Sequence, residues 1–186
     1  MAGLLTRTQA MPLLATALAQ GGDTAGARAV ISQTPLDCYP CLRARGVIES
    51  EARNWTAAGE WFARAERAAP SIPFAYSERG ATLTAKGDLD GAIAKFESAH
   101  KKGPHFADPL ELWGEALIAK NRSDLAVAKF EEADRYAPNW GRLHLKWGEA
   151  LWWLGKRDDA KKQFAIAAGL ALTSSEKSEL AKVLHG

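Results

Sequence analysis

Stretches of about a dozen residues, each with its apolar side chains on one helical face, alternate along the chain with short turns containing Gly, Asn or Pro. Runs of β-branched residues are scarce, so the pattern predicts helices throughout. The predicted helices lie at 8–20, 24–33, 40–52, 56–68, 74–86, 90–102, 108–120, 124–136, 142–154, 158–170 and 174–184.

The predicted turns carry residues that stop and start helices. Gly87, Asn121 and Gly155 fall where a helix needs a left-handed residue to end. Asp88 and Ser123 follow them and are expected to cap the next helices.

A recurrence with a period of about 34 residues dominates the sequence. Five columns of four positions hold the same residue type in every slot but one, where Leu172 replaces the proline. The columns are Gly46, Gly80, Gly114 and Gly148; Ala58, Ala92, Ala126 and Ala160; Phe62, Phe96, Phe130 and Phe164; Ala65, Ala99, Ala133 and Ala167; and Pro70, Pro104 and Pro138.

Each column has a packing reason. Glycine and alanine let two helices of one repeat approach closely, and phenylalanine fills the gap between them. The second alanine lets the next repeat pack on, and proline ends the second helix because it cannot continue a hydrogen-bonded turn.

The period and the columns resemble the tetratricopeptide repeat (TPR) family, strongly over 39–172, and the arrangement is similar to that of bacterial members. The resemblance implies an all-α, right-handed superhelical solenoid of helix–turn–helix repeats with a C-terminal capping helix. It implies one domain over 1–186, made of a degenerate first repeat at 8–38, repeats at 39–72, 73–106, 107–140 and 141–172, and the cap at 173–186. In the degenerate repeat Ala27 and Ile31 take the Ala and Phe slots, and Pro35 shortens the second helix.

Composition excludes several classes of protein. The 186 residues include 24 Lys and Arg against 22 Asp and Glu, and this net charge of +2 argues against nucleic acid or anionic lipid as a partner. No apolar run is long enough to cross a membrane. Two cysteines and four scattered histidines form no zinc-site spacing. No phosphate-binding loop and no nucleophile–base set is visible, so we expect no cofactor, no metal and no catalysis.

The motif Cys38-Tyr39-Pro40-Cys41 is the one chemically reactive feature. Its spacing permits a disulfide, and the start of a helix stabilises a thiolate. The motif superficially resembles a thioredoxin-type redox pair but follows a helix instead of a strand. Two packing cysteines, a structural or regulatory disulfide and a redox centre all stay open.

The N-terminus has two interpretations. Arg7, the apolar stretch after it and the small residues Ala17-Leu18-Ala19 resemble a signal peptide with its cleavage site. The stretch is short and contains Pro12 and Thr16, so we favour a first helix and a cytoplasmic protein. If residues 1–19 act as a signal peptide, the protein is periplasmic.

By resemblance to the family, the first helices of the repeats line a concave face. We expect a partner to contact this face through Arg43, Phe74, Glu78, Phe106, Glu111, Glu115, Trp140, Arg142, Lys146, Glu149 and Trp152. A solvated charged face is the alternative. The carboxylate clamp of chaperone-binding members is missing, because its positions hold Arg43, Val47, Glu78 and Asp108.

Glu115 and Glu149 are one repeat period apart and occupy the same slot on neighbouring helices. Stacked like charges need a cation, which Lys146, Arg142 or a bound peptide would supply. Trp113 and Trp147 are expected in the core. The adjacent Trp152 and Trp153 cannot both point inward, so at least one must reach a surface.

The function that these features indicate is a non-enzymatic scaffold that binds a protein or peptide in its concave face. One alternative is a redox-switched or redox-active protein that uses Cys38 and Cys41. The other is a self-assembling homo-oligomer, such as a homodimer formed through the aromatic residues near Trp152 at one end of the array.

Overall fold

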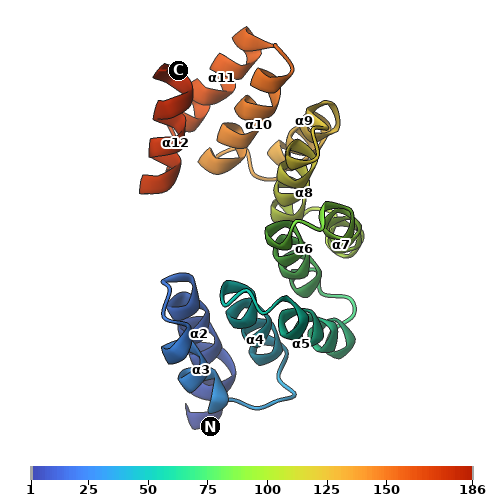
Figure 1. Ribbon diagram of the computed structural model, residues 1–186, viewed down its shortest axis with the longest axis vertical. Helices are drawn as coiled ribbons and strands as arrows, with labels where there is room; N and C mark the ends of the chain where they lie inside the picture. The colour runs from blue at the N-terminus through green and yellow to red at the C-terminus, as the bar shows by residue number, and fades with distance from the viewer. Residues whose placement is uncertain (1, 186) are drawn as a thin grey trace. The chain divides into compact units, whose positions relative to one another are not determined.

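The computed structural model describes residues 2–185, and within that range it contains helices and turns but no β-strand (Figure 1). The helices fall into two compact units, Met1–Gly103 and Pro104–Gly186. A single domain over 1–186 stays a prediction.

The first unit contains α1 (Ala2–Leu5), the π-helix η1 (Thr6–Ala10), α2 (Met11–Gln20), α3 (Thr24–Ser32), α4 (Tyr39–Glu51), α5 (Trp55–Ala68), α6 (Phe74–Lys86) and α7 (Leu89–Lys102). The second contains α8 (Ala107–Ala119), α9 (Ser123–Asp134), α10 (Gly141–Trp153), α11 (Arg157–Ala168) and α12 (Ser174–His185). Predicted and observed helices agree within about two residues, except at the start. The start of the helix expected at 8–20 is wrong, because residues 8–10 belong to the π-helix η1 and α2 begins at Met11.

The glycine and phenylalanine columns meet inside each repeat. A β-carbon placed on Gly46 would come within 2.6 Å of Phe62, and the later glycines are equally close to Phe96, Phe130 and Phe164. All four rings are fully buried. The predicted reason for the columns is therefore confirmed: glycine provides the space that each ring fills.

The turns between paired helices contain one left-handed residue at the same slot of successive repeats. The residues with positive φ at this slot are Arg53, Gly87, Asn121 and Gly155. Asp88 caps α7 as expected, accepting a hydrogen bond from the Gly91 backbone N–H. The cap predicted at Ser123 is wrong, because Arg122 occupies that position and Ser123 is already the first residue of α9.

The buried Arg45 closes the end of α3, and its side chain is only 7% exposed. Its guanidinium donates to the carbonyl oxygens of Ile31 and Thr34 at 2.8 and 3.1 Å. Trp61 lies beneath it, with the ring centroid 5.4 Å from the guanidinium carbon. One arginine therefore donates to two carbonyl groups at the end of α3, where the helix itself supplies few donors.

The degenerate first repeat has its own small core. Ala15 and Ala19 of α2 pack with Ala27 and Ile31 of α3, and the same cluster includes Ile48 of α4. Residues of the segment that resembles a signal peptide are thus part of the folded first repeat.

The expectation that Trp113 and Trp147 lie in the core is only partly right, because both are half-buried. Lys129 covers the Trp113 ring at 4.3 Å from its centroid. Trp147 flanks the buried cluster around Phe164.

Candidate functional site

The first unit has a groove along the inner helices of its repeats. Its walls come from α2 (Thr16, Gln20), α4 (Val47, Ser50, Glu51) and α6 (Glu78, Ala81, Thr82, Ala85), with Arg53 and Trp55 just beyond the end of α4. Most of these side chains are small or uncharged. The wall of the groove therefore carries few charges.

Two of the predicted contact residues in this unit pair with each other. Arg43 makes a bidentate ion pair with Glu78, in which Nε donates to Oε2 at 2.9 Å. The guanidinium carbon of Arg43 also lies 4.8 Å from the ring centroid of Phe74, whose side chain is 37% exposed. The cation of Arg43 is thus already satisfied by α6.

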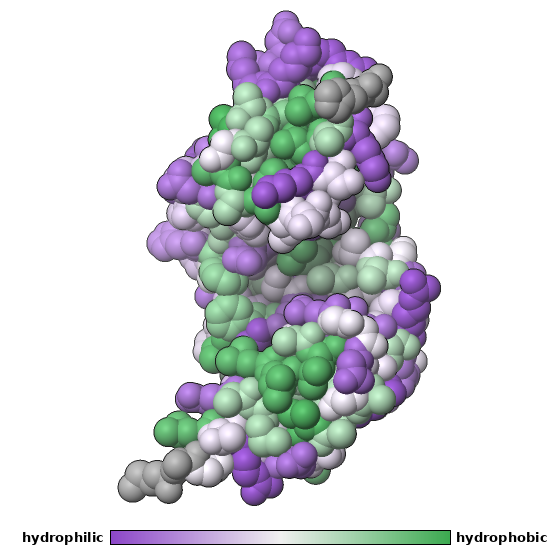
Figure 2. All heavy atoms as spheres, turned by 90° about the vertical axis from the view of Figure 1, so that its left-hand side faces the viewer, coloured by the Kyte–Doolittle hydropathy of each residue, from purple (hydrophilic) through white to green (hydrophobic). Residues whose placement is uncertain are grey.

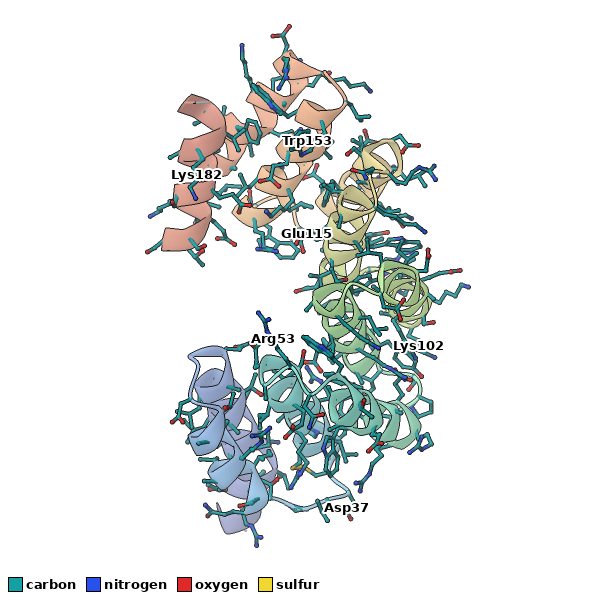
Figure 3. The ribbon with its side chains drawn as sticks, in the orientation of Figure 1. Asp37, Arg53, Lys102, Glu115, Trp153 and Lys182 are labelled. Carbon is teal, nitrogen blue, oxygen red and sulfur yellow. A yellow bond between two sulfur atoms is a disulfide. The ribbon has the colours of Figure 1, made fainter. Side chains whose placement is uncertain are left out.

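Arg53 is the one cation among the described residues that line the groove. Its φ is 57°, in the left-handed region that costs a non-glycine residue about 1–2 kcal/mol. The side chain is exposed, and no ion pair or side-chain hydrogen bond involves it in the part of the chain that the structure describes. Figure 3 shows it projecting from the end of α4. Sequence reasoning missed this residue, although it lies in the same column of the repeat as Gly87.

Arg142 joins the inner faces of three helices in the second unit. Its Nε donates to Glu111 of α8 at 3.0 Å, and its terminal nitrogens contact Glu115 of α8 and Glu176 of α12. Glu111 is 1% exposed, and burial together with the neighbouring Glu115 carboxyl raises its pKa well above the usual range. The cation predicted for Glu115 is thus supplied by the chain itself.

Lys146 connects α10 to the capping helix in the same way. Its ammonium group donates to Glu149 at 3.2 Å and also binds Glu179 of α12. Burial raises the pKa of Glu149 to about 7, the Glu179 carboxyl adds to this effect, and Lys146 opposes it. Two predicted contact residues, Arg142 and Lys146, are therefore engaged by α12, and Glu149 is paired with Lys146.

The remaining predicted contacts lie at helix ends. Phe106 and Trp140 occupy the same slot of successive repeats and are half-buried at the starts of α8 and α10. Trp152 packs toward the core, 6.5 Å from Phe164 between ring centroids, and Arg157 covers its outer face at 3.5 Å.

Trp153, which was absent from the predicted contact set, is the tryptophan that reaches the surface, with 72% of its area exposed. It stands between two hollows, one lined by Ile118 and Leu154 and the other by Trp152 and Val183. Figure 3 shows it at the end of α10. The expectation that at least one of the adjacent tryptophans is exposed is confirmed.

Cys38 and Cys41 form a disulfide at the start of α4. The Cys38 sulfur also accepts a hydrogen bond from the Cys41 backbone N–H at 3.2 Å, which makes it the helix cap. Cys41 is fully buried, and both sulfurs lie within 4.0 Å of backbone carbonyls of Arg7 and Thr8. The open question of free or paired cysteines is thereby answered.

Among the residues that the structure describes, no group of three His, Cys, Asp or Glu side chains could hold a metal ion. Over the same residues, no helix has the length and apolar character needed to span a bilayer.

Comparisons with known proteins agree with this geometry. A family model described as Tetratricopeptide repeat matches residues 78–139. The same columns of residues continue on both sides of that segment. Residues 78–139 therefore match the tetratricopeptide repeat (TPR) family.

Solved structures extend the likeness in fold to nearly the full length of this chain. A thermophilic TPR protein of Thermus thermophilus, TTC0263, has a TM-score of 0.81 at 18% identity, and the alignment covers 96% of this chain and 100% of that one. The structure titled "Functional Characterization of Pseudomonas Aeruginosa pilF" has a TM-score of 0.77 at 17% identity, with 98% and 86% covered. MamA has a TM-score of 0.66 at 20% identity, with 89% and 95% covered. No curated protein matches the chain. At these identities the likeness shows the TPR solenoid fold alone.

Proposed function

We propose that this chain is a non-enzymatic interaction scaffold that binds an extended segment of a partner protein in the groove of its first unit. The observation that carries the proposal is Arg53. This arginine occupies a left-handed position where the next three repeats hold Gly87, Asn121 and Gly155. A residue that costs stability and makes no ion pair within the described fold is best explained by a role in binding.

The charges of the groove favour a ligand with one acidic side chain. Arg53 is the available cation, because Arg43 is held by Glu78. Glu51 lies on the same wall and would repel a run of acidic residues. The small walls formed by Ala81, Ser50 and Thr82 leave room for a peptide backbone.

Selection from a random peptide library displayed on phage tests this function. We expect wild-type protein to enrich peptides with a single Asp or Glu, and we expect Arg53→Gly to lose them while Arg53→Lys keeps most of the binding. Trp153→Ala, in the other unit, is the matched control and should retain binding. Enriched peptides that bind Arg53→Gly as well as wild type would count against the groove as the site.

A redox role for Cys38 and Cys41 stays the second candidate, favoured only by their disulfide. It requires that partner binding differ between reduced and oxidised protein. The scaffold proposal expects the selected peptides to bind equally with and without reductant, and equally to Cys41→Ser.

A cytoplasmic location belongs to the same proposal. It is supported by Ala15 and Ala19, which a signal peptidase would remove and which pack in the core of the first repeat. Fractionation of cells expressing a C-terminally tagged chain tests it, and a product shortened by about 19 residues in the periplasm would contradict it.

A further inference from the structure

The outer face of α2 carries an apolar stripe that nothing in the described chain covers. Leu13 is 73% exposed and Leu14 is 52% exposed. Ala10 and Ala17 are also exposed, and the spacing 10, 13, 14, 17 places all four on one side of a helix. In Figure 2, a broad apolar area lies on the lower half of the view, which holds α2 and α3.

The equivalent residues of the second repeat indicate the structural role of this stripe. Three residues of the first repeat correspond to three of the second: Ala15 to Gly46, Ala27 to Ala58 and Ile31 to Phe62. The two members of each pair are the same number of residues apart in the sequence. By the same spacing, the stripe corresponds to the buried residues Cys41, Ala44, Arg45 and Ile48 of α4.

Two of those equivalents, Ala44 and Ile48, make the contact between repeats, because they share one buried cluster with Ala15 and Ala19 of α2. The stripe on α2 is therefore the stacking face of the solenoid, exposed at the N-terminal end.

We propose that this stripe, Ala10, Leu13, Leu14 and Ala17, pairs with the same stripe of a second copy and forms a two-fold symmetric homodimer. An antiparallel pairing centred between Leu13 and Leu14 sets each leucine against a leucine and each alanine against an alanine of the other copy. This surface is separate from the peptide groove and does not depend on it.

Charge favours a second copy as the occupant. No ionisable residue lies between Arg7 and Asp23, so two stripes can meet without like-charge repulsion. The side chain of Arg7 is directed to its own chain, where its Nε donates to the Gln33 carbonyl at 2.8 Å. The other end of the array is a poorer match for an apolar stripe, because the exposed residues of α12 include Lys177, Ser178 and Lys182.

Sedimentation velocity of the whole chain over a concentration series is the test. We expect wild type to dimerise and Leu13→Glu to raise the dissociation constant at least about tenfold. An equimolar mixture of Leu13→Glu and Leu13→Lys should restore the dimer. Leu125→Glu, which places the same charge on an exposed leucine of α9, is the control and should dimerise like wild type.

Several outcomes would overturn the proposal. They are a wild-type monomer at all concentrations, a Leu13→Glu dimer as tight as wild type, and equal loss of dimer in Leu125→Glu. A monomer that co-sediments with phosphatidylcholine vesicles through Leu13 would also overturn it and would assign the stripe to lipid. Thermal unfolding of Leu13→Glu separates loss of pairing from loss of fold, because an exposed position should leave the midpoint unchanged.

Discussion

Gly80 and Phe96 lie so close together that a β-carbon on Gly80 would come within 2.6 Å of the Phe96 ring. The glycine sits on the first helix of a repeat and the ring on the second. Because the ring is buried on every side, it has no free direction in which to move.

Gly80→Ala is therefore expected to destabilise the protein by about 1–3 kcal/mol, since overpacking forces the two helices apart. Urea denaturation followed by circular dichroism measures this loss. Gly59→Ala is the matched control on a helix with open space at the glycine, and it should gain up to about 1 kcal/mol. An equal gain in the two variants would show that helix propensity, and not the Phe96 contact, determines the effect.

Arg53→Gly should increase the free energy of unfolding by about 1 kcal/mol, because glycine adopts the left-handed conformation without the steric cost that arginine bears. Asn121→Gly, at the equivalent turn, should gain less, because asparagine tolerates that conformation. Denaturant titrations of the two variants and wild type provide the comparison. No gain at Arg53 would remove the argument that this position trades stability for binding.

Glu149→Gln should stabilise the protein at pH 8 and have little effect near pH 5. The pKa of Glu149 is raised from 4.5 to about 7 in the folded protein, so ionising it costs stability as pH rises through that window. Removing the charge should recover about 2 kcal/mol above pH 7, while Lys146 keeps its contact with Glu179. Thermal or urea unfolding as a function of pH gives the profile.

Glu179→Gln is the opposing control for that experiment. The pKa of Glu179 is lowered, because its hydrogen bond and ion pair with Lys146 outweigh the effect of burial. Its charge therefore adds stability at neutral pH, and this contribution disappears as pH falls through the folded pKa. We expect Glu179→Gln to weaken the fold at pH 7 and to match wild type in acid. The same pH profile for both variants would contradict the assignment.

Arg45→Met should cost about 2 kcal/mol, because it removes one hydrogen bond from the Ile31 carbonyl and leaves the buried Thr34 carbonyl without its Arg45 donor. Arg64→Met tests the specificity of this effect, since Arg64 stacks on the same Trp61 ring from an exposed position. It should change stability by less than about 1 kcal/mol. Similar losses at both positions would mean that stacking on Trp61 determines the effect, and not the closure of α3.

The packing of the paired helices could be predicted from the sequence because the same helix–helix contact recurs in each repeat. A ring such as Phe96 needs a glycine at a fixed distance along the chain, and the recurrence makes that need visible in four successive repeats. The pairing of charges was partly visible. The shared slot of Glu115 and Glu149 indicated a missing cation, but only the structure assigns Arg142 to one and Lys146 to the other.

Other parts of the candidate site could not be predicted. Which of Trp152 and Trp153 faces outward depends on the rotation of α10 about its axis, which the pattern of apolar positions leaves uncertain. Nothing in the sequence indicated that Arg45 is buried at the end of α3, because its column continues with Arg79, Trp113 and Trp147. Arg53 did have a signal, since a left-handed slot filled by an arginine is unusual for its column.

The linked charges of α8, α10 and α12 restrict how the second unit can recognise another molecule. Each of Arg142 and Lys146 is shared by two or more carboxylates, so a ligand gains little binding energy by adding one more charge. The ligand would have to replace an existing ion pair with a new one, and the energy lost with the first pair nearly equals the energy gained with the second. Binding at this face would therefore respond weakly to ionic strength and would select its ligand by shape.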